Sequence, residues 1–476
     1  MVIPRSVVRS SSRGWTLALT SVAFFMVALD ALVVITALPA IQRDLGASLS
    51  TLEWTVNAYT LTFAAGLITA AALGDRLGRR RIFGTGLALF AAASAACALA
   101  PTTELLIAAR AVQGIGAAMI MPLSLTILTA AFPAERRGAI VGIWGGIAGL
   151  AVAIGPLVGG AVTEGLDWHW IFWLNVPIGL VAALLSVVRL DESHGPATRL
   201  DLPAVGLVTG GAVGLVWGLV RAGDAGWGSA EVIAALSLGL LLMGGFVVWE
   251  RRAPAPMLPL RLFRSRAFAA ANVTAFLMTS ALFAAAFLAA QYFQFVLHYS
   301  PLGTGLRFLP WTATVIVVAP AAGMVSDRIG QRPVMATGML LQGTGLAWLA
   351  LVATTGVHYT HLILPLLIGG VGVSMAMATT PTAALGAVAP GDIGKASGTT
   401  STLQRFGGVF GIAIASAVFA ANGHLGTPAS FAAGFRPAVA VAAGLSCLGA
   451  VSALAVGRRR QRAIVAQPEV ALAAGD

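Results

Sequence analysis

Long apolar stretches alternate with short polar segments along almost the whole chain. Each stretch is long enough to cross a bilayer as an α-helix, which takes about 20 residues. The fourteen stretches are residues 15–39, 51–73, 82–100, 104–131, 138–163, 169–188, 202–220, 230–249, 268–297, 304–324, 333–354, 361–388, 396–421 and 435–456. We therefore expect an all-α polytopic membrane protein with 14 transmembrane helices, embedded in a lipid bilayer.

Composition supports this class. Of the 476 residues, 58% are hydrophobic and 10% are charged, against about 25% charged in soluble domains. The mean hydropathy is +0.88. These values exclude a soluble enzyme, a disordered regulator and a secreted disulfide scaffold, because none of these could cover its surface with so few charges.

The basic residues predict the orientation in the membrane. The net charge is +11, which in a soluble protein would suggest nucleic-acid binding. Here 23 of the 29 basic residues fall in the loops on the side of the two termini, and four fall on the other side. Because cytoplasmic loops retain Lys and Arg, both termini are expected in the cytoplasm and no nucleic acid is expected as a partner.

An internal repeat predicts how the helices are grouped. The loop ALGDRLGRRR (72–81) resembles GMVSDRIGQR (323–332), and an offset of 252 aligns Asp75 with Asp327 and Arg76 with Arg328. The copies are eight stretches apart, so two six-helix bundles fit if two helices are inserted between them. The expected parts are a first bundle at 1–190, the inserted helices at 191–265, a second bundle at 266–457 and a cytoplasmic tail at 458–476.

Asp30 and Arg110 are the sharpest signals among the charged residues inside apolar stretches, where charge is costly and indicates function. Asp30 is at the middle of the first stretch and Arg110 lies in LLIAARAVQGIGAAM of the fourth. We expect Asp30 to bind and release a proton, with Arg110 tuning its protonation. The alternatives are that Asp30 is a structural carboxyl bonded to backbone or to Arg110, and that Arg110 anchors backbone carbonyls.

The repeated loop has a mechanical interpretation. Its charged groups are expected to pair across the cytoplasmic gap and to latch one conformation of two rocking halves, whereas the alternative is simple anchoring at the cytoplasmic face. The candidate gating residues are Gly74, Asp75, Arg76, Gly78, Arg79, Arg80, Asp327 and Arg328.

Other polar and small residues suggest a substrate path. The fifth stretch contains AVAIGPLVGG, whose Gly155, Pro156, Gly159 and Gly160 predict a kinked helix that packs closely. The candidates for a substrate cavity combine amide, aromatic and cationic groups, which suit an amphiphilic ligand. An aromatic belt facing lipid is the alternative for those near residue 292, and a side chain that reaches a membrane face is the alternative for Arg405. The cavity candidates are Gln113, Gln291, Tyr292, Gln294, Gln404 and Arg405.

Cofactors and catalytic groups are not expected. The only lysine, Lys395, is not part of a nucleotide-binding P-loop, so uphill transport would use an ion gradient. His358 and His361 have no carboxylate or cysteine neighbour, and no metal site is expected. An intramembrane enzyme would need clustered polar groups at depth, which the stretches lack.

These motifs resemble those of the major facilitator superfamily, and within it the fourteen-span drug–proton antiporter branch of bacterial multidrug exporters. ALGDRLGRRR is similar to the signature loop, with Ala71 in place of the usual glycine. LLIAARAVQGIGAA is similar to the span-four motif and LDALVVITALPAI to the span-one motif that carries Asp30. AVAIGPLVGG resembles the antiporter motif, with Ala151 in place of its first glycine.

The resemblance implies two six-helix bundles around a central cavity that opens alternately to either side. It also implies proton-coupled export of lipophilic drugs or toxic small molecules from the bacterial plasma membrane. The alternatives are a dedicated exporter of one endogenous metabolite or natural product and, in another class, a non-transporting membrane sensor. Substrate identity, proton stoichiometry and oligomeric state are not determined by the sequence, although a monomer fits it.

Overall fold

A computed structural model describes residues 10–195, 201–253, 256, 258, 260–389 and 392–457. All regular elements among these residues are helices, and they contain no strand. The first bundle is made from α1 (Ser10–Leu45), α2 (Leu49–Leu77), α3 (Arg79–Ala98), α4 (Thr103–Ala131), α5 (Ala134–Gly165), α6 (Trp170–Trp173) and α7 (Asn175–Arg189). The predicted tail 458–476 lies outside the described residues.

The remaining helices follow after a polar segment. Two long helices come first, α8 (Leu202–Ala225) and α9 (Ala230–Arg252), then a short helix η1 (Leu260–Arg264). The last group is α10 (Arg266–Gln291), η2 (Tyr292–Val296), α11 (Pro301–Thr312), α12 (Thr314–Ile329), α13 (Gln331–Val352), α14 (Thr360–Gly386), α15 (Ile393–Asn422) and α16 (Pro428–Leu454). The all-helical class is thus confirmed.

The number of membrane spans is confirmed only in part. The described residues contain 12 helices long and apolar enough to cross a membrane, or 13 if the bent helix α2 is one span. Helix α5 is 32 residues long, but only its Gly149–Gly165 part qualifies as an apolar helix and it is shorter than a span. The expected count of fourteen remains a prediction.

Side-chain caps fix where several helices begin. Ser48 accepts a hydrogen bond from the Thr51 amide at the start of α2, and Thr102 accepts one from the Leu105 amide at the start of α4. Ser265 caps α10 in the same way. These oxygens satisfy amides that have no partner inside the helix.

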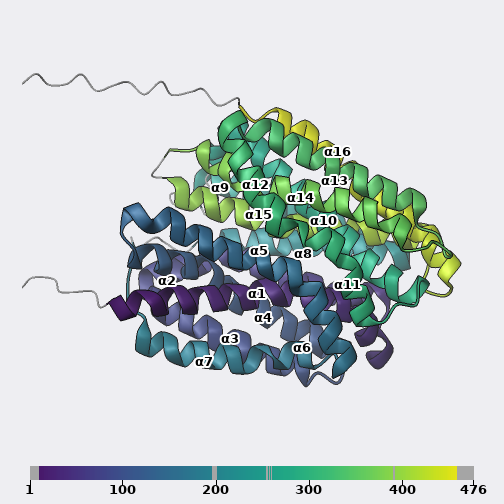
Figure 1. The fold of residues 1–476 in the computed structure, drawn as a ribbon, viewed down its shortest axis with the longest axis horizontal. Helices are drawn as coiled ribbons and strands as arrows, with labels where there is room; N and C mark the ends of the chain where they lie inside the picture. The colour runs from purple at the N-terminus through teal and green to yellow at the C-terminus, as the bar shows by residue number, and fades with distance from the viewer. Residues whose placement is uncertain are drawn as a thin grey trace, which may run out of the picture.

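The two bundles meet along a seam that α8 covers. In Figure 1 the purple and blue helices α1 to α4, α6 and α7 lie in the lower half, whereas α12 to α16 lie in the upper half, and α5 and α11 meet between them. Helix α8 packs against α9, against α2 of the first bundle and against α15 of the second. Helix α1 begins and α16 ends on the left of the same view.

The two repeated loops have the same backbone geometry. Gly78 ends α2 and precedes α3 with φ 110°, and Gly330 ends α12 and precedes α13 with φ 91°. Glycine adopts positive φ far more readily than other residues. The sequence repeat is therefore also a structural repeat.

Substituting these two glycines tests the repeat. A Cβ at Gly78 would lie 2.7 Å from Glu192 Cδ, whereas at Gly330 it would meet nothing within 4 Å. We expect Gly330→Ala to cost about 1–2 kcal/mol of stability from strain alone, and Gly78→Ala to cost more. Thermal unfolding of the purified protein measures both, and equal losses would contradict the added effect of Glu192.

Candidate functional site

Asp30 and Arg110 form an ion pair inside the first bundle. Asp30 lies on α1 and Arg110 on α4, and Arg110 Nη1 is 2.6 Å from Asp30 Oδ2. The residues are only 3% and 1% exposed, respectively. Close pairing is what allows both charges to be buried, since an isolated charge would cost several kcal/mol.

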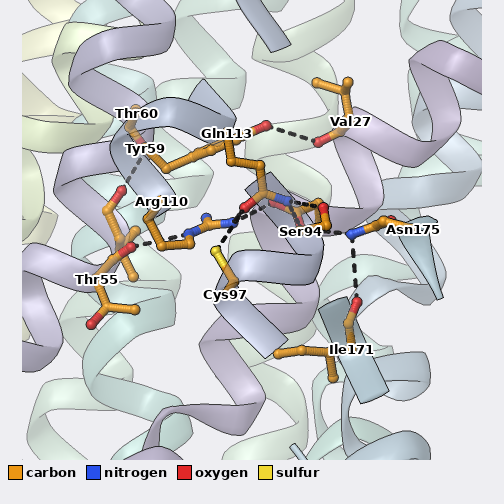
Figure 2. Close-up of polar contacts among 12 residues, drawn as sticks. Val27, Thr55, Tyr59, Thr60, Ser94, Cys97, Arg110, Gln113, Ile171 and Asn175 are labelled. Carbon is orange, nitrogen blue, oxygen red and sulfur yellow. Dashed lines mark hydrogen bonds and ion pairs between the residues drawn. The ribbon is translucent and has the colours of Figure 1, made fainter. Parts of the chain in front are cut away.

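Three amide or hydroxyl side chains complete this polar cluster. Gln113 Nε2 donates to Asp30 Oδ1 at 2.9 Å, and Asn175 Nδ2 donates to the same oxygen at 2.9 Å. Gln113 also accepts from Arg110 Nη1 at 2.6 Å and donates to Ser94 Oγ at 2.8 Å. Figure 2 shows Arg110, Gln113, Ser94 and Asn175 converging from α3, α4 and α7.

Arg110 has further partners that do not involve Asp30. Its Nε donates to the Thr55 carbonyl at 3.2 Å, and its guanidinium carbon lies 4.2 Å from the centre of the Tyr59 ring on α2 (Figure 2). Tyr59 donates to the Val27 carbonyl at 3.3 Å. The cation is thus held from α2 as well as from α1.

Small residues on α4 allow this close assembly. A Cβ at Gly114 would lie 2.3 Å from the Tyr59 carbonyl oxygen, and one at Gly116 would lie 2.8 Å from the Phe90 amide nitrogen. Helix α4 therefore approaches α2 at one glycine and α3 at the other. The motif around Arg110 brings its charged group and its neighbours within hydrogen-bonding distance.

The prediction that Gln113 lines a substrate cavity is wrong. Its side chain is fully buried and bridges Arg110, Asp30 and Ser94. Asn175, Ser94 and Tyr59 were not predicted as members of the site. Asn175 is a polar residue in the apolar stretch 169–188, and that position was the available signal.

The expected pairing of the repeated loop across the cytoplasmic gap stays a prediction, because the contacts described for its first copy are local. Asp75 Oδ1 binds Arg79 Nη2 at 2.7 Å, and Glu192, just after α7, accepts from the Arg80 amide at 2.9 Å. The Arg80 and Arg81 side chains lie 3.6 and 3.7 Å from Glu192. Asp75, Arg79, Arg80 and Arg81 belong to the first bundle, and Glu192 follows its last helix.

The other gating candidates have different surroundings. A Cβ at Gly74 would lie 2.3 Å from a methyl group of Leu123 on α4, so this glycine serves helix packing. Arg76, Asp327 and Arg328 are exposed.

The glycines of α5 face both bundles. A Cβ at Gly159 would lie 2.5 Å from the Val33 carbonyl oxygen on α1, and one at Gly155 would lie 2.8 Å from Leu32. At Gly160 it would lie 2.2 Å from the Pro301 carbonyl oxygen on α11. Conversely, a Cβ at Gly305 of α11 would lie 2.5 Å from the Pro156 carbonyl oxygen. Helices α5 and α11 thus touch through backbone.

An apolar cavity lies between the bundles. Its volume is about 50 Å³. Thr312 and Ser374 are its hydroxyl side chains; Thr312 donates to the Ala153 carbonyl at 2.8 Å and Ser374 to the Gly370 carbonyl at 2.7 Å. The lining residues are Leu32, Ile35, Val152, Pro156, Leu282, Phe283, Ala286, Phe308, Trp311, Thr312, Val315, Val373, Ser374 and Met377.

The predicted cavity residues near position 292 do not line this cavity. Gln291 is buried and donates to the Phe287 carbonyl, and the Tyr292 hydroxyl donates to the Thr354 carbonyl at 2.6 Å. Gln294 donates to the Thr36 carbonyl at 2.8 Å and so joins the bundles. These residues end α10 and form the π-helix η2, whose different periodicity changes the direction of its side chains.

Gln404 and Arg405 are on α15 and are also absent from the lining of this cavity. Arg405 reaches the first bundle, with its guanidinium carbon 4.3 Å from the centre of the Phe63 ring on α2. Among the described residues, no group of three or more His, Cys, Asp or Glu side chains could hold a metal ion.

Comparison with known proteins places this geometry in a family. The model of the Major Facilitator Superfamily matches residues 20–412 and 311–472. The chain is 36% identical over 415 residues to the tetracenomycin C resistance and export protein of Streptomyces glaucescens, covering 86% of this chain and 77% of that one. It is 34% identical over 458 residues to the puromycin resistance protein pur8 of Streptomyces alboniger, covering 93% and 90%.

The fold also matches solved structures. A crystal structure of the peptide transporter POT with sulfate superimposes with a TM-score of 0.67 at 17% sequence identity, covering 95% of this chain and 96% of that one. At this identity the likeness concerns the fold alone.

A double-mutant cycle tests the buried ion pair. Asp30→Asn leaves the Arg110 cation without its carboxylate, and Arg110→Gln leaves the carboxylate without its cation. We expect each change to cost about 3–5 kcal/mol, and the double variant to cost clearly less than their sum. Thermal unfolding of the purified variants measures this, and additive losses would show that the two charges do not interact.

Proposed function

This chain belongs to the major facilitator superfamily, and we propose that it is a proton-coupled antiporter that exports lipophilic small molecules by alternating access. The chain is a multi-pass membrane protein and a transporter of small molecules. We place it in the bacterial plasma membrane with both termini in the cytoplasm. The excess of basic residues on the side of the termini supports this orientation.

Relatives and cavity both support export of lipophilic compounds. Two relatives are named as a tetracenomycin C resistance and export protein and a puromycin resistance protein. The cavity lies between α1 and α5 of one bundle and α10, α11, α12 and α14 of the other. Its apolar walls suit the body of a lipophilic substrate, and its position between the bundles is where alternating access requires a binding site.

The contacts between the bundles support a closed outer gate. Gln294 binds the Thr36 carbonyl, and the Leu302 amide donates to Glu164 at 2.9 Å. Gly160 lies against Pro301 in the same region, where α5 ends and α11 begins. In the orientation proposed above, this end faces the outside.

The buried pair of Asp30 and Arg110 carries the proposal of proton coupling. In the conformation described, Asp30 accepts three hydrogen bonds, one of them from the Arg110 cation. A proton that enters from outside would neutralise Asp30 and weaken its bond to Arg110. The free energy of pairing thereby becomes available to shift the balance between two conformations of α1 and α4.

Arg110 remains supported when Asp30 takes up a proton. Gln113 Oε1, the Thr55 carbonyl and the Tyr59 ring contact its guanidinium group independently of the carboxylate. Gln113 also binds both charges, so its amide transmits a change at one to the other. This arrangement lowers the cost of leaving Arg110 without an ionised partner.

Neutralising Asp30 should abolish the use of the proton gradient. We expect everted vesicles with the wild-type protein to accumulate dyes or antibiotics, puromycin among them, and to release them when a protonophore is added. Asp30→Asn should reduce uphill accumulation at least about tenfold, because the proton site is lost. Asp44→Asn is the matched control; its carboxylate accepts from Trp168 near the end of α1 and should leave uphill accumulation within about twofold.

Two results would contradict the coupling mechanism. One is wild-type accumulation that is unaffected by collapse of the gradient. The other is full uphill transport by Asp30→Asn. Exchange of labelled substrate is measured on the same vesicles, because it reports binding and alternating access without requiring proton coupling.

A side chain at Gly160 should hold the outer gate open. Gly160→Ala would place a methyl group against the Pro301 carbonyl, whereas Gly165→Ala on the same helix meets nothing within 4 Å. We expect Ser374→Cys, in a Cys447→Ala background, to react several-fold faster with an external impermeant maleimide when Gly160→Ala is added. Equal acceleration by Gly165→Ala, or none by Gly160→Ala, would contradict the gate.

A further inference from the structure

Arg405 is a cation at membrane depth. It lies in the apolar span Lys395–Asn422, twelve residues after the start of α15 at Ile393. At 1.5 Å per residue this is about 18 Å along the helix. A charge at this depth is costly and requires a compensating group.

The described protein groups around Arg405 do not neutralise it. Its guanidinium carbon lies 4.3 Å from the centre of the Phe63 ring, and Nη2 lies 3.7 Å from Met121 Sδ. Among the ion pairs between described residues, none includes Arg405. An aromatic face and a thioether sulfur stabilise a cation weakly, and neither carries a negative charge that would neutralise it.

A comparison with Arg110 shows that Arg405 lacks an acidic partner among the described residues. Both arginines lie inside apolar spans, and both pack on an aromatic ring of α2. Arg110 is fully buried beside Asp30, whereas Arg405 is only half-buried. A guanidinium group has five N–H donors in a planar fork that matches a carboxylate or sulfonate, and here a weak sulfur acceptor takes one of them.

The position of Arg405 fits a role in recognition during transport. It belongs to α15 of the second bundle, and its contacts are with α2 and α4 of the first. A ligand bound there would therefore touch groups of both bundles, which move relative to each other in alternating access. The apolar cavity offers no charged side chain among its lining residues, so recognition of an acidic group must come from another position.

We propose that Arg405 is an anion-binding residue that selects acidic amphiphiles, compounds with an aromatic body and a carboxylate or sulfonate group. That these compounds are transported rests on the proposed export function. Their binding at Arg405 is independent of that function. The Phe63 ring beside the guanidinium favours an aromatic body next to the acid. The same positive charge disfavours dicationic compounds.

Binding of two matched probes tests this site. The probes are 8-anilinonaphthalene-1-sulfonate and N-phenyl-1-naphthylamine, which share the aromatic body and differ in the sulfonate. Fluorescence titration of the purified full-length protein gives a Kd for each. We expect Arg405→Gln to weaken sulfonate binding at least about tenfold, the loss of a charge-assisted hydrogen bond, and to change the Kd of the neutral probe by less than about twofold.

Three further variants separate recognition from structure. Arg405→Lys keeps the charge without the fork and should lose less affinity than Arg405→Gln. Arg436→Gln is the matched control, an arginine of α16 whose Nε donates to the Ala350 carbonyl, and should leave both Kd values unchanged. Met121→Leu removes the sulfur contact and should also leave the sulfonate Kd within about twofold.

Several outcomes would overturn the assignment. One is an unchanged sulfonate Kd in Arg405→Gln, and another is an equal loss of affinity for both probes. A third is displacement of the sulfonate probe by sodium sulfate as effectively as by benzenesulfonate, which would indicate a site for a free ion. The titration needs no proton gradient. If the protein shows no proton-coupled export but its sulfonate Kd still depends on Arg405, the proposed function is rejected and the binding site is retained.

Discussion

The cost of placing charge inside a membrane is the constraint on which the rest of this structure depends. Asp30 and Arg110 meet that cost together, at 2.6 Å and away from water. Gln113 and Asn175 satisfy the remaining carboxylate oxygen. Because each partner lowers the cost of burying the other, neutralising one of them shifts the balance between conformations of the helices that carry both.

The pair lies within one bundle, whereas the cavity lies between two. Helix α1 connects them, since it carries Asp30 and also contributes Leu32 and Ile35 to the cavity wall. Helix α5 packs on α1 through Gly155 and Gly159 and touches α11 through Gly160. A change at Asp30 therefore has a short physical path to the cavity and to the contact between the bundles.

The sequence predicted the depth of residues well and their neighbours poorly. Apolar stretches located Asp30 and Arg110, and the repeat located Gly78 and Gly330, because these features depend on local composition and backbone conformation. The neighbours depend on the rotation of each helix and on distant segments. Glu192 binds the loop of Arg80 from 112 positions away, and no local pattern indicated it.

The cavity residues were predicted wrongly for the same reason, because the rotation of a helix is not visible in the sequence. Gln291 and Tyr292 are polar groups in an apolar stretch, but at the start of η2 they point to backbone carbonyls of the second bundle. The cavity itself is lined by ordinary apolar residues of six helices, which nothing in one sequence distinguishes from core. The sequence places Arg405 in an apolar stretch, but only the structure showed that its contacts lie across the seam.

The central claim is that Asp30 alternates between an ionised form paired with Arg110 and a protonated form. Infrared difference spectroscopy of the protein in lipid, recorded across a pH titration, measures this most directly through the carbonyl stretch of a protonated carboxylic acid. The account predicts a band from a buried acid that grows as the pH falls in the wild type and is missing in Asp30→Asn. The same band in Asp30→Asn, or no band from a buried acid in the wild type, would contradict it.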